Sequence, residues 1–290
     1  MLDAARRAPT LLGEAFGPVH DFLWAQLNSD GGFKNRTGQS DIYYTVFGID
    51  CLLALGVDPP LQSLERFVRP LEDGAALEFV PATCLARAWS FLPTVAPESW
   101  RTSLKQRILR QRGADGGFAG AEPAGSIASA FAAVSALEDL KARIPEPQRL
   151  AAFLRRHAAP AGGYSNELTM PLPSTTASAA ACLLLLECGA VPDAATTSWL
   201  LARAHRRGGF GATAHAAMPD LRSTGAAVHA LARIAGKARP ALPPALRERT
   251  LDYLDALWSN RGAFHSSWAD EALDCEHLFY ALLTLGHLAE

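Results

Sequence analysis

The stretch that decides the fold is residues 29–56, SDGGFKNRTGQSDIYYTVFGIDCLLALG. It begins with a Gly-Gly-aromatic turn, continues through a short polar loop, and ends in a run of helical length that is apolar nearly all round. Related stretches recur at residues 114–140, 160–189, 206–236 and 260–286. Residues 72–92 form a weaker copy that lacks the aromatic residue and has a shorter loop. The chain is therefore predicted to consist of six similar units.

One polar residue opens each apolar run, and these residues give the period of the repeat. They are Asp41, Glu78, Ser126, Ser174, Asp220 and Asp274, at intervals of 37, 48, 48, 46 and 54 residues. Periods of this size are typical of repeat architectures, in which one supersecondary unit is stacked many times.

Each unit is predicted to be a helical hairpin with an outer and an inner helix. Amphipathic segments that fit outer helices lie at residues 19–27, 100–112, 147–158, 196–207 and 244–258. The glycines permit a left-handed conformation at the turn, and the aromatic residue that follows plugs the turn into the core. These aromatic residues are Phe33, Phe118, Tyr164, Phe210 and Phe264. Inner helices that are apolar all round must be covered on both sides, and closing the row into a ring removes its exposed ends. We predict an all-α protein, an α/α toroid of six inner and six outer helices that forms a single domain over residues 1–290.

Composition excludes several classes of protein. The 290 residues are 49% hydrophobic and 19% charged, which is typical of a soluble globular protein with a large core. Because the chain has 27 basic and 29 acidic residues, it lacks the excess of positive charge that nucleic acid binding requires. Five cysteines without a CxxC pair indicate a reducing compartment, and no apolar run reaches the roughly 20 residues of a transmembrane helix. We expect a cytoplasmic protein with no nucleic acid partner and no transmembrane segment.

The expected ring places six helix N-termini together at one mouth. An N-terminus offers unpaired N–H groups and a partial positive charge, which suits an anion. Aromatic residues of the inner helices follow below this mouth: Tyr44, Phe47, Trp89, Phe131, Phe279 and Tyr280. A polar rim above an apolar throat fits an isoprenoid diphosphate, although the same aromatic residues could instead fill the centre.

The repeated turns and inner helices resemble the prenyltransferase and squalene-oxidase repeat superfamily. The resemblance rests on QLNSDGGF at 26–33, DIYYTVFGIDCLLALG at 41–56 and DCEHLFYALLTLG at 274–286, and it covers nearly the whole chain. The last repeat is most similar to the β subunit of protein prenyltransferases, whose final inner helix opens with an Asp-x-x-His-x-x-Tyr pattern, here Asp274, His277 and Tyr280. The resemblance implies that His277 binds a catalytic zinc ion.

The resemblance also implies further zinc ligands and a partner. The family has an Asp-x-Cys at the start of the preceding inner helix, where this chain has Asp220 followed by Arg222 in place of the cysteine. Asp220, His277 and Cys275 are therefore the candidate zinc ligands. Protein prenyltransferases act with a separate α subunit on a protein or peptide acceptor, and both are expected here as partners.

The candidate substrate site differs from the pattern of the family. The basic loop that binds the diphosphate in the family is replaced by GATAHAAMP at 211–219, which offers only His215. Arg222, Lys34 and Arg36 are the substitute cations. Tyr44, Phe47 and Tyr280 are expected to line the isoprenoid site, and His277 and Asp274 are the candidate catalytic residues.

Each of these residues also has a purely structural interpretation. Asp and Ser are favoured N-caps, which alone explains Asp41, Asp220 and Asp274. The helix dipole would lower the pKa of Cys275, or the thiol is simply buried and inert. His215, His265, Trp268 and Glu271 lie in mouth loops and could be ordinary surface residues.

Three functions remain open from the sequence. The first is transfer of a prenyl group from its diphosphate, with a cysteine thiol as a candidate acceptor. The second is a non-catalytic ring that binds an isoprenoid or a partner protein. The third is a terpene cyclase, although its Asp-x-Asp-Asp motif is absent and the nearest acidic pair is Asp270-Glu271.

Overall fold

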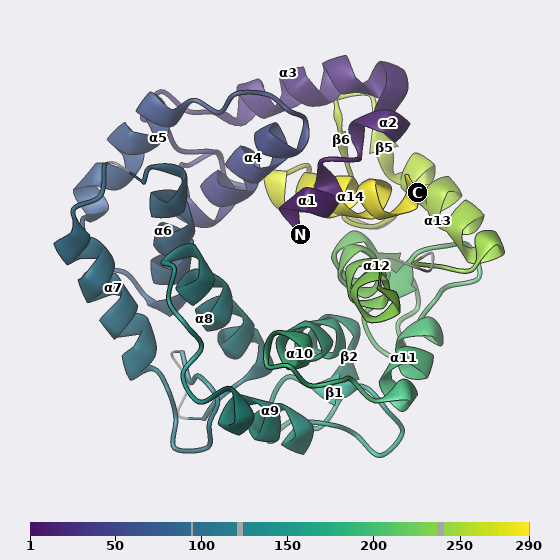
Figure 1. Cartoon of the computed structure of the whole chain (residues 1–290). Coiled ribbons are helices and arrows are strands. Elements are labelled where there is room, and N and C mark those ends of the chain that lie inside the picture. The colour runs from purple at the N-terminus through teal and green to yellow at the C-terminus, as the bar shows by residue number, and fades with distance from the viewer. Residues whose placement is uncertain (94, 121–123, 237–240, 290) are drawn as a thin grey trace.

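The structure is a computed structural model that describes residues 1–93, 95–120, 124–236 and 241–289, and it is a closed ring of two concentric layers of helices (Figure 1). The inner layer contains α4 (Ile42–Ala54), α6 (Phe79–Phe91), α8 (Ile127–Asp139), α10 (Thr175–Glu187), α12 (Leu221–Ala235) and α14 (Cys275–Leu288). The outer layer contains α3 (Phe16–Gln26), α5 (Leu61–Val68), α7 (Glu98–Arg110), α9 (Pro147–Arg156), α11 (Ala194–Leu201) and α13 (Pro244–Leu257). Each inner helix packs against the next, and α14 packs against α4. The predicted all-α toroid is confirmed.

The inner helices begin at the polar residues that set the repeat. Five of these residues accept a hydrogen bond from a backbone N–H of the first helical turn, namely Asp41, Ser126, Ser174, Asp220 and Asp274. Glu78 precedes α6 without such a bond. Because every hairpin runs the same way, all six N-termini lie at one end of the ring, which we call the mouth.

The glycine turns have a second role that the sequence did not reveal. In five of the six turns the first glycine lies against the backbone of the next outer helix. A Cβ on Gly208, for example, would come within 1.8 Å of the Arg249 carbonyl oxygen in α13. A Cβ on Gly262, in the last turn, would come within 2.0 Å of the Pro18 carbonyl oxygen in α3. These five turns therefore join neighbouring hairpins, including the last to the first, whereas Gly74 in the weaker copy lies against side chains alone.

Short strands at the mouth were not predicted. β1 (Tyr164–Ser165) pairs with β2 (Pro173–Ser174), β3 (Phe210–Gly211) with β4 (Pro219–Asp220), and β5 (Trp258–Ser259) with β6 (Ala263–Phe264), all antiparallel. Two-residue strands are too short for an alternating pattern to show in the sequence. They fix the two ends of the loops before α10 and α12 and the start of the loop before α14.

The N-terminal segment lies over the end of the ring opposite the mouth. It contains the short helices α1 (Leu2–Ala5) and α2 (Pro9–Leu12) and a 3-10 turn, η1 (Gly13–Ala15); a second, η2 (Arg69–Leu71), follows α5. α1 packs against α14 and α4, with its N-terminus close to the middle of the ring in Figure 1. Gly286 allows this contact, since a Cβ there would lie 1.9 Å from the Ala4 carbonyl oxygen.

Some aromatic residues are buried between the two layers of helices, and others line the inside of the ring. The turn aromatics are buried, as predicted. Trp89, which was expected in the throat, is instead fully buried between the layers and packs against Trp100 of α7, with ring centroids 5.8 Å apart. Phe279 is also buried, whereas Tyr44, Phe47, Phe131 and Tyr280 keep partial exposure. All five cysteines are free, and no helix within the described ranges is long and apolar enough to cross a membrane.

Candidate functional site

The candidate site lies at the mouth, on the seam where the first hairpin meets the last. The loop between α3 and α4 carries Arg36, whose Nε is 2.8 Å from Asp274 Oδ2 and whose Nη1 is 3.0 Å from Asp270 Oδ2. Its Nη2 lies 3.4 Å from His277 Nδ1. Arg36 thus contacts three residues that are more than 230 positions away in the sequence.

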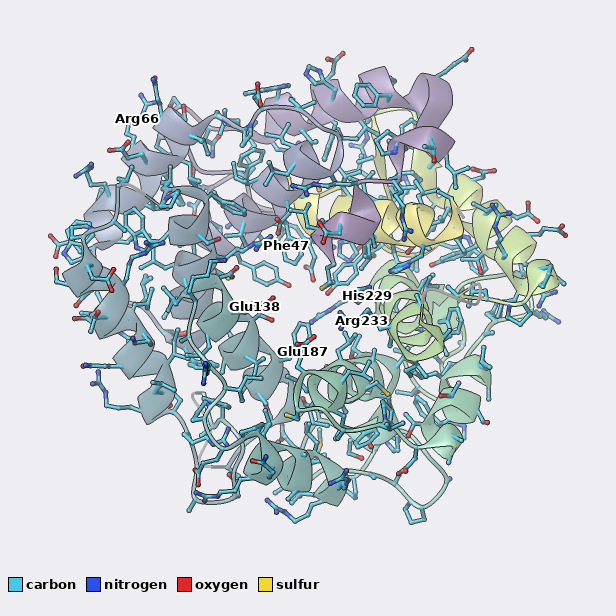
Figure 2. All side chains as sticks on the ribbon, viewed as in Figure 1. Phe47, Arg66, Glu138, Glu187, His229 and Arg233 are labelled. Carbon is cyan, nitrogen blue, oxygen red and sulfur yellow. The ribbon has the colours of Figure 1, made fainter. Side chains whose placement is uncertain are left out.

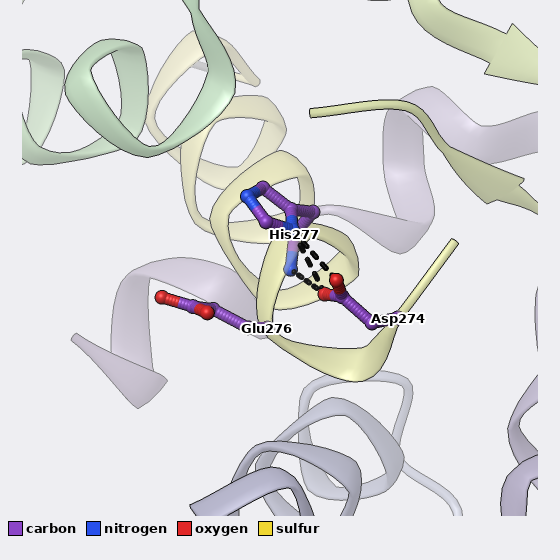
Figure 3. A group of neighbouring side chains, drawn as sticks. All are labelled: Asp274, Glu276 and His277. Atoms are coloured by element: carbon purple, nitrogen blue, oxygen red, sulfur yellow. Dashed lines mark hydrogen bonds and ion pairs between the residues drawn. The ribbon is translucent and has the colours of Figure 1, made fainter. Parts of the chain in front are cut away.

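Asp274 organises this seam. Its side chain is buried, accepts a hydrogen bond from the His277 backbone N–H at 2.9 Å, and is hydrogen-bonded to His277 Nδ1 at 2.8 Å (Figure 3). Burial opposes the charged carboxylate, but the hydrogen bonds from His277 and Arg36 outweigh it and hold the pKa of Asp274 below its ordinary value. Asp274 is therefore ionised at neutral pH and fixes the orientation of the imidazole.

A second polar group surrounds Glu276, which points away from Asp274 in Figure 3. Glu276 Oε1 accepts a hydrogen bond from the Tyr43 hydroxyl at 2.7 Å, and Arg222 Nε lies 3.7 Å from the same oxygen. Burial, followed by the charge of Glu276, raises the pKa of Tyr43, so this hydroxyl stays protonated and donates. The seam therefore joins α4, α12 and α14.

The helix N-termini at the mouth are less available than the sequence suggested. The first N–H of α8, α10 and α12 donates to a loop carbonyl of the following hairpin: Ile127 N to Asn166 O (3.1 Å), Thr175 N to Ala212 O (2.8 Å) and Leu221 N to Ser266 O (2.7 Å). The capping side chains take further N–H groups. The expected ring of unpaired N–H groups is therefore wrong for these three helices, and the positive charge at the seam comes from Arg36 and Arg222.

A second set of charged residues lies at the opposite end of the inner helices. Arg87 of α6 binds Asp50 of α4 at 2.6 Å and Asp139 of α8 at 2.9 Å. Arg233 pairs with Glu187 at 3.0 Å, and His229 Nδ1 is 2.8 Å from His287 Nε2. Figure 2 shows Glu138, Glu187, His229 and Arg233 gathered around the middle of the ring, with Phe47 pointing toward it.

The comparisons with known proteins agree with this architecture. The chain matches the family described as prenyltransferase alpha-alpha toroid domain at residues 15–84, 83–188 and 176–290. It belongs to this family. A search of curated proteins found no match.

Several solved structures share the fold of this prenyltransferase toroid. The type II terpene cyclase MstE from Scytonema is 12% identical, with a TM-score of 0.64 over 97% of this chain and 98% of that chain. A protein from Actinoplanes is 15% identical, with a TM-score of 0.62 over 95% and 98%. Candida albicans protein geranylgeranyltransferase-I complexed with GGPP is 16% identical, with a TM-score of 0.54 over 78% and 66%.

The toroid has one group of three metal-binding residue types in the described part of the chain. The ligand atoms of Asp274, Glu276 and His277 all lie within 4.8 Å of one another. However, Asp274 is already bonded to Arg36 and His277, and Glu276 to Tyr43 and Arg222, so two guanidinium groups supply the charge that a metal would bring. The donors are also mainly oxygen, whereas zinc prefers nitrogen and sulfur. As arranged, these residues do not fit zinc.

Two of the three predicted zinc ligands lie outside this group. Asp220 accepts a hydrogen bond from the Ser223 backbone N–H at 2.7 Å as the cap of α12. Cys275 is fully buried, and burial, followed by the charge of Asp274, raises the pKa of its thiol. Of the two interpretations of Cys275, the buried and inert thiol is therefore confirmed, and the lowering of its pKa by the helix dipole is wrong.

The predicted substrate-binding residues are also divided. Arg36 and Arg222 reach the seam, whereas Lys34 Nζ donates to the Ala25 carbonyl at the end of α3, at 2.6 Å. His215 is exposed in the loop between β3 and β4. The Phe47 ring lies 6.1 Å from that of Tyr280, between centroids, and Tyr44 packs edge-on against Tyr43 at 5.5 Å.

The remaining mouth-loop candidates take part in packing. Trp268 stacks edge-on against Tyr253 at 5.6 Å and His205 at 5.8 Å, and the Glu271 carbonyl accepts a hydrogen bond from Arg261 at 3.1 Å. The ring of His265 is partly buried, and its Nδ1 atom has no hydrogen-bond partner among the residues that the structure describes.

Sequence analysis missed Glu276, Tyr43 and the Arg87 network as site residues. The signal for the network was available, since Asp50 and Arg87 are lone charged residues within apolar helical runs. Such residues are seldom buried without a partner. Tyr43 gave no signal of its own, because its partner lies 233 positions away.

Proposed function

We propose that the protein binds an isoprenoid diphosphate and transfers its prenyl group. The observation that supports this is the pair of guanidinium groups, Arg36 and Arg222, beside the partly exposed aromatic residues of α4 and α14. The diphosphate would bind the arginines, and the hydrocarbon chain would lie along Phe47 and Tyr280. Two proteins with this fold have geranylgeranyl compounds bound, the geranylgeranyltransferase with GGPP and MstE with geranylgeranyl dihydroxybenzoate.

The transfer breaks the bond between the first isoprenoid carbon and its diphosphate oxygen, and the diphosphate leaves with the electron pair. Arg36 and Arg222 stabilise this developing charge, since guanidinium groups bind phosphate oxygens in a bidentate manner. The new bond forms to the acceptor nucleophile, with a cysteine thiol of a peptide as the first candidate. His277, held by Asp274, accepts the proton of the thiol as general base.

The family also suggests a zinc ion and a partner. Zinc would activate a thiol acceptor, but the seam residues do not fit it, and the proposed reaction has no step through zinc. The protein acceptor and a separate α-subunit-like partner belong to the proposal. Zinc content of the purified protein tests the first point, because a stoichiometric zinc ion would show that the seam rearranges around it.

The experiment is incubation with labelled farnesyl or geranylgeranyl diphosphate and a cysteine-containing peptide. We expect retained lipid and a labelled thioether product, with both reduced about tenfold or more by Arg222→Ala, because one charge-assisted bond is lost. Arg222→Lys should restore part of the binding. Arg66→Ala is the matched control, since Arg66 lies on the outer face (Figure 2). Lipid retention without a product would leave a binding protein, and no retention would contradict the proposal.

A second candidate is cyclisation of an isoprenoid by a carboxylic acid inside the ring. It is favoured by Asp50 and Asp139, since burial raises the pKa of both carboxyl groups despite Arg87. A buried acid of this kind can protonate an alkene. Product analysis separates the two candidates, because a cyclic product formed without any peptide would favour cyclisation.

A further inference from the structure

An exposed apolar loop stands out on the mouth of the ring. Leu168, Met170 and Leu172 lie in the loop between β1 and β2, with exposed fractions of 56%, 71% and 59%. They alternate with Thr169 and Pro171, and the stretch 168–172 carries no charge. Three large apolar side chains exposed within five residues form a patch, which in soluble proteins marks an interaction site more often than isolated residues do.

The neighbouring loop exposes a further large apolar residue. Met218, in the loop between β3 and β4, is 38% exposed. The two loops belong to adjacent hairpins, which are joined where Thr175 N donates to Ala212 O. Both loops are held at their ends by strand pairs, so the apolar side chains project from an ordered base.

Exposed arginines precede both loops in the sequence. Arg155 and Arg156 end α9 just before the first loop, Arg206 and Arg207 follow α11 just before the second, and all four are exposed. Residues 155–174 and 202–222, which form the mouth side of these two hairpins, contain six arginines and two acidic residues. This side is therefore basic, although the whole chain has a net charge of −2.

We propose that this surface, formed by Leu168, Met170, Leu172 and Met218 with the exposed arginines that precede their loops, docks on an anionic lipid bilayer. Apolar side chains that enter the headgroup region, together with basic residues that attract anionic lipids, are the two contributions that hold proteins at a membrane surface. A partner protein would not require the excess of arginine, which is why the bilayer is the favoured occupant. Docking would place the mouth of the ring against the membrane.

The inference does not depend on the proposed transfer reaction. Vesicle binding needs no substrate, and a protein that docks without reacting would contradict only the proposed function. Conversely, a protein that reacts with soluble diphosphates but does not bind vesicles would contradict only the proposed docking surface.

The test is co-sedimentation of the full chain with vesicles of phosphatidylcholine and phosphatidylglycerol. We expect binding that weakens with salt, and a loss of about tenfold or more on replacing Leu168, Met170 and Leu172 together with serine. Val191→Ser is the matched control, because Val191 is 83% exposed but follows α10 at the opposite end of the ring. All four positions are exposed, so each variant should fold, which circular dichroism checks.

Charge is tested by a second variant, Arg155→Glu with Arg206→Glu. This variant should lose binding to anionic vesicles while keeping its secondary structure. Absence of binding by the unaltered protein, or unchanged binding by the triple serine variant, would overturn the proposal. The proposal would also be overturned if the unaltered protein formed a concentration-dependent dimer without binding vesicles and the triple serine variant stayed monomeric. The surface would then bind a second copy of the chain.

Discussion

At the scale of the residue, Arg36 links the two hairpins at which the ring closes. It binds Asp274 and Asp270 on the last hairpin from a loop of the first, and so joins two ends of the chain. Asp274 is 1% exposed, so removal of its partner leaves a buried carboxylate with fewer hydrogen bonds. Such a group costs the folded state more than a lost surface ion pair does.

We predict that Arg36→Ala lowers the free energy of unfolding by about 1–3 kcal/mol at neutral pH. The pKa of Asp274 is lower in the folded chain than in the unfolded chain. Its contribution is therefore present above about pH 4 and is lost as the pH falls through the folded value. Urea unfolding as a function of pH measures both effects, with a smaller acid-induced loss expected in the variant. Equal stability of the two proteins at pH 7 would contradict the role given to Arg36.

At the scale of the element, helices are joined through backbone contacts and through one ion network. The glycine turns lie so close to the next outer helix that a side chain has no room, and Gly208 also has a positive φ of 87°. Arg87 lies between α4 and α8 and binds a carboxylate on each. Both features act between neighbouring hairpins, so their loss should weaken the packing of hairpins rather than of a single helix.

Gly208→Ala should destabilise the fold by about 2 kcal/mol or more, because the positive φ and the contact with the Arg249 carbonyl both oppose a side chain. Gly56→Ala is the control, since Gly56 has a positive φ of 72° but open space around it. Gly56→Ala should lower the free energy of unfolding by only about 1 kcal/mol. Thermal unfolding of both variants measures the difference, and similar losses would show that the backbone contact is unimportant.

Arg87→Met should lower the free energy of unfolding by about 3–5 kcal/mol at pH 7, because the buried carboxylate of Asp50 and the partly buried one of Asp139 lose their partner. Burial raises the pKa of Asp50 and Asp139 in the folded chain above the value in the unfolded chain. Ionisation of these two groups therefore lowers the free energy of unfolding as the pH rises through their folded pKa values. The variant should therefore recover part of its stability near pH 5. Arg233→Met is the control, because Arg233 and Glu187 are about half exposed, and it should lose less than about 1 kcal/mol. A pH-independent loss in Arg87→Met would contradict this account.

At the scale of the whole molecule, the ring is closed in both of its layers. Its outer layer closes through Gly262 and Pro18, and its inner layer through α14 and α4, where α1 also packs. A closed ring has no terminal hairpin with an unpaired face, which a row of repeats would have. A ligand bound along the inner helices at the seam would therefore contact the first and the last hairpin together.

Binding of geranylgeranyl diphosphate should raise the temperature of unfolding. A ligand at about 100 times its Kd adds about 2.7 kcal/mol to the free energy of unfolding. Inorganic pyrophosphate should give a much smaller shift at the same concentration, because it lacks the hydrocarbon chain that would contact Phe47 and Tyr280. Differential scanning fluorimetry measures both, and equal shifts would place the ligand at the arginines alone.

The candidate site could be predicted only in part. Asp274 and His277, at the start of the last inner helix, came from a motif in a repeat of known register. Arg36 came from its position in a mouth loop, and Arg222 from its position at the start of the preceding inner helix. The partners of these residues did not follow, because Tyr43 and Arg36 meet α14 across more than 230 positions. The burial of Cys275 was one of two interpretations left open, since the sequence gives its position in the first turn but not the direction of its side chain.

The sequence by itself determined the six hairpins, the starts of the inner helices and the closed ring, because capping residues, glycine turns and apolar periodicity act over a few neighbouring residues and recur in every repeat. Tertiary structure decided which hairpin supplies each partner. The loop carbonyls that occupy the N–H groups of α8, α10 and α12, the backbone contacts of the glycines, and the salt bridges of Arg36 and Arg87 all arise between hairpins. Such contacts depend on the distance and angle at which whole helices pack, which no local pattern of residues contains.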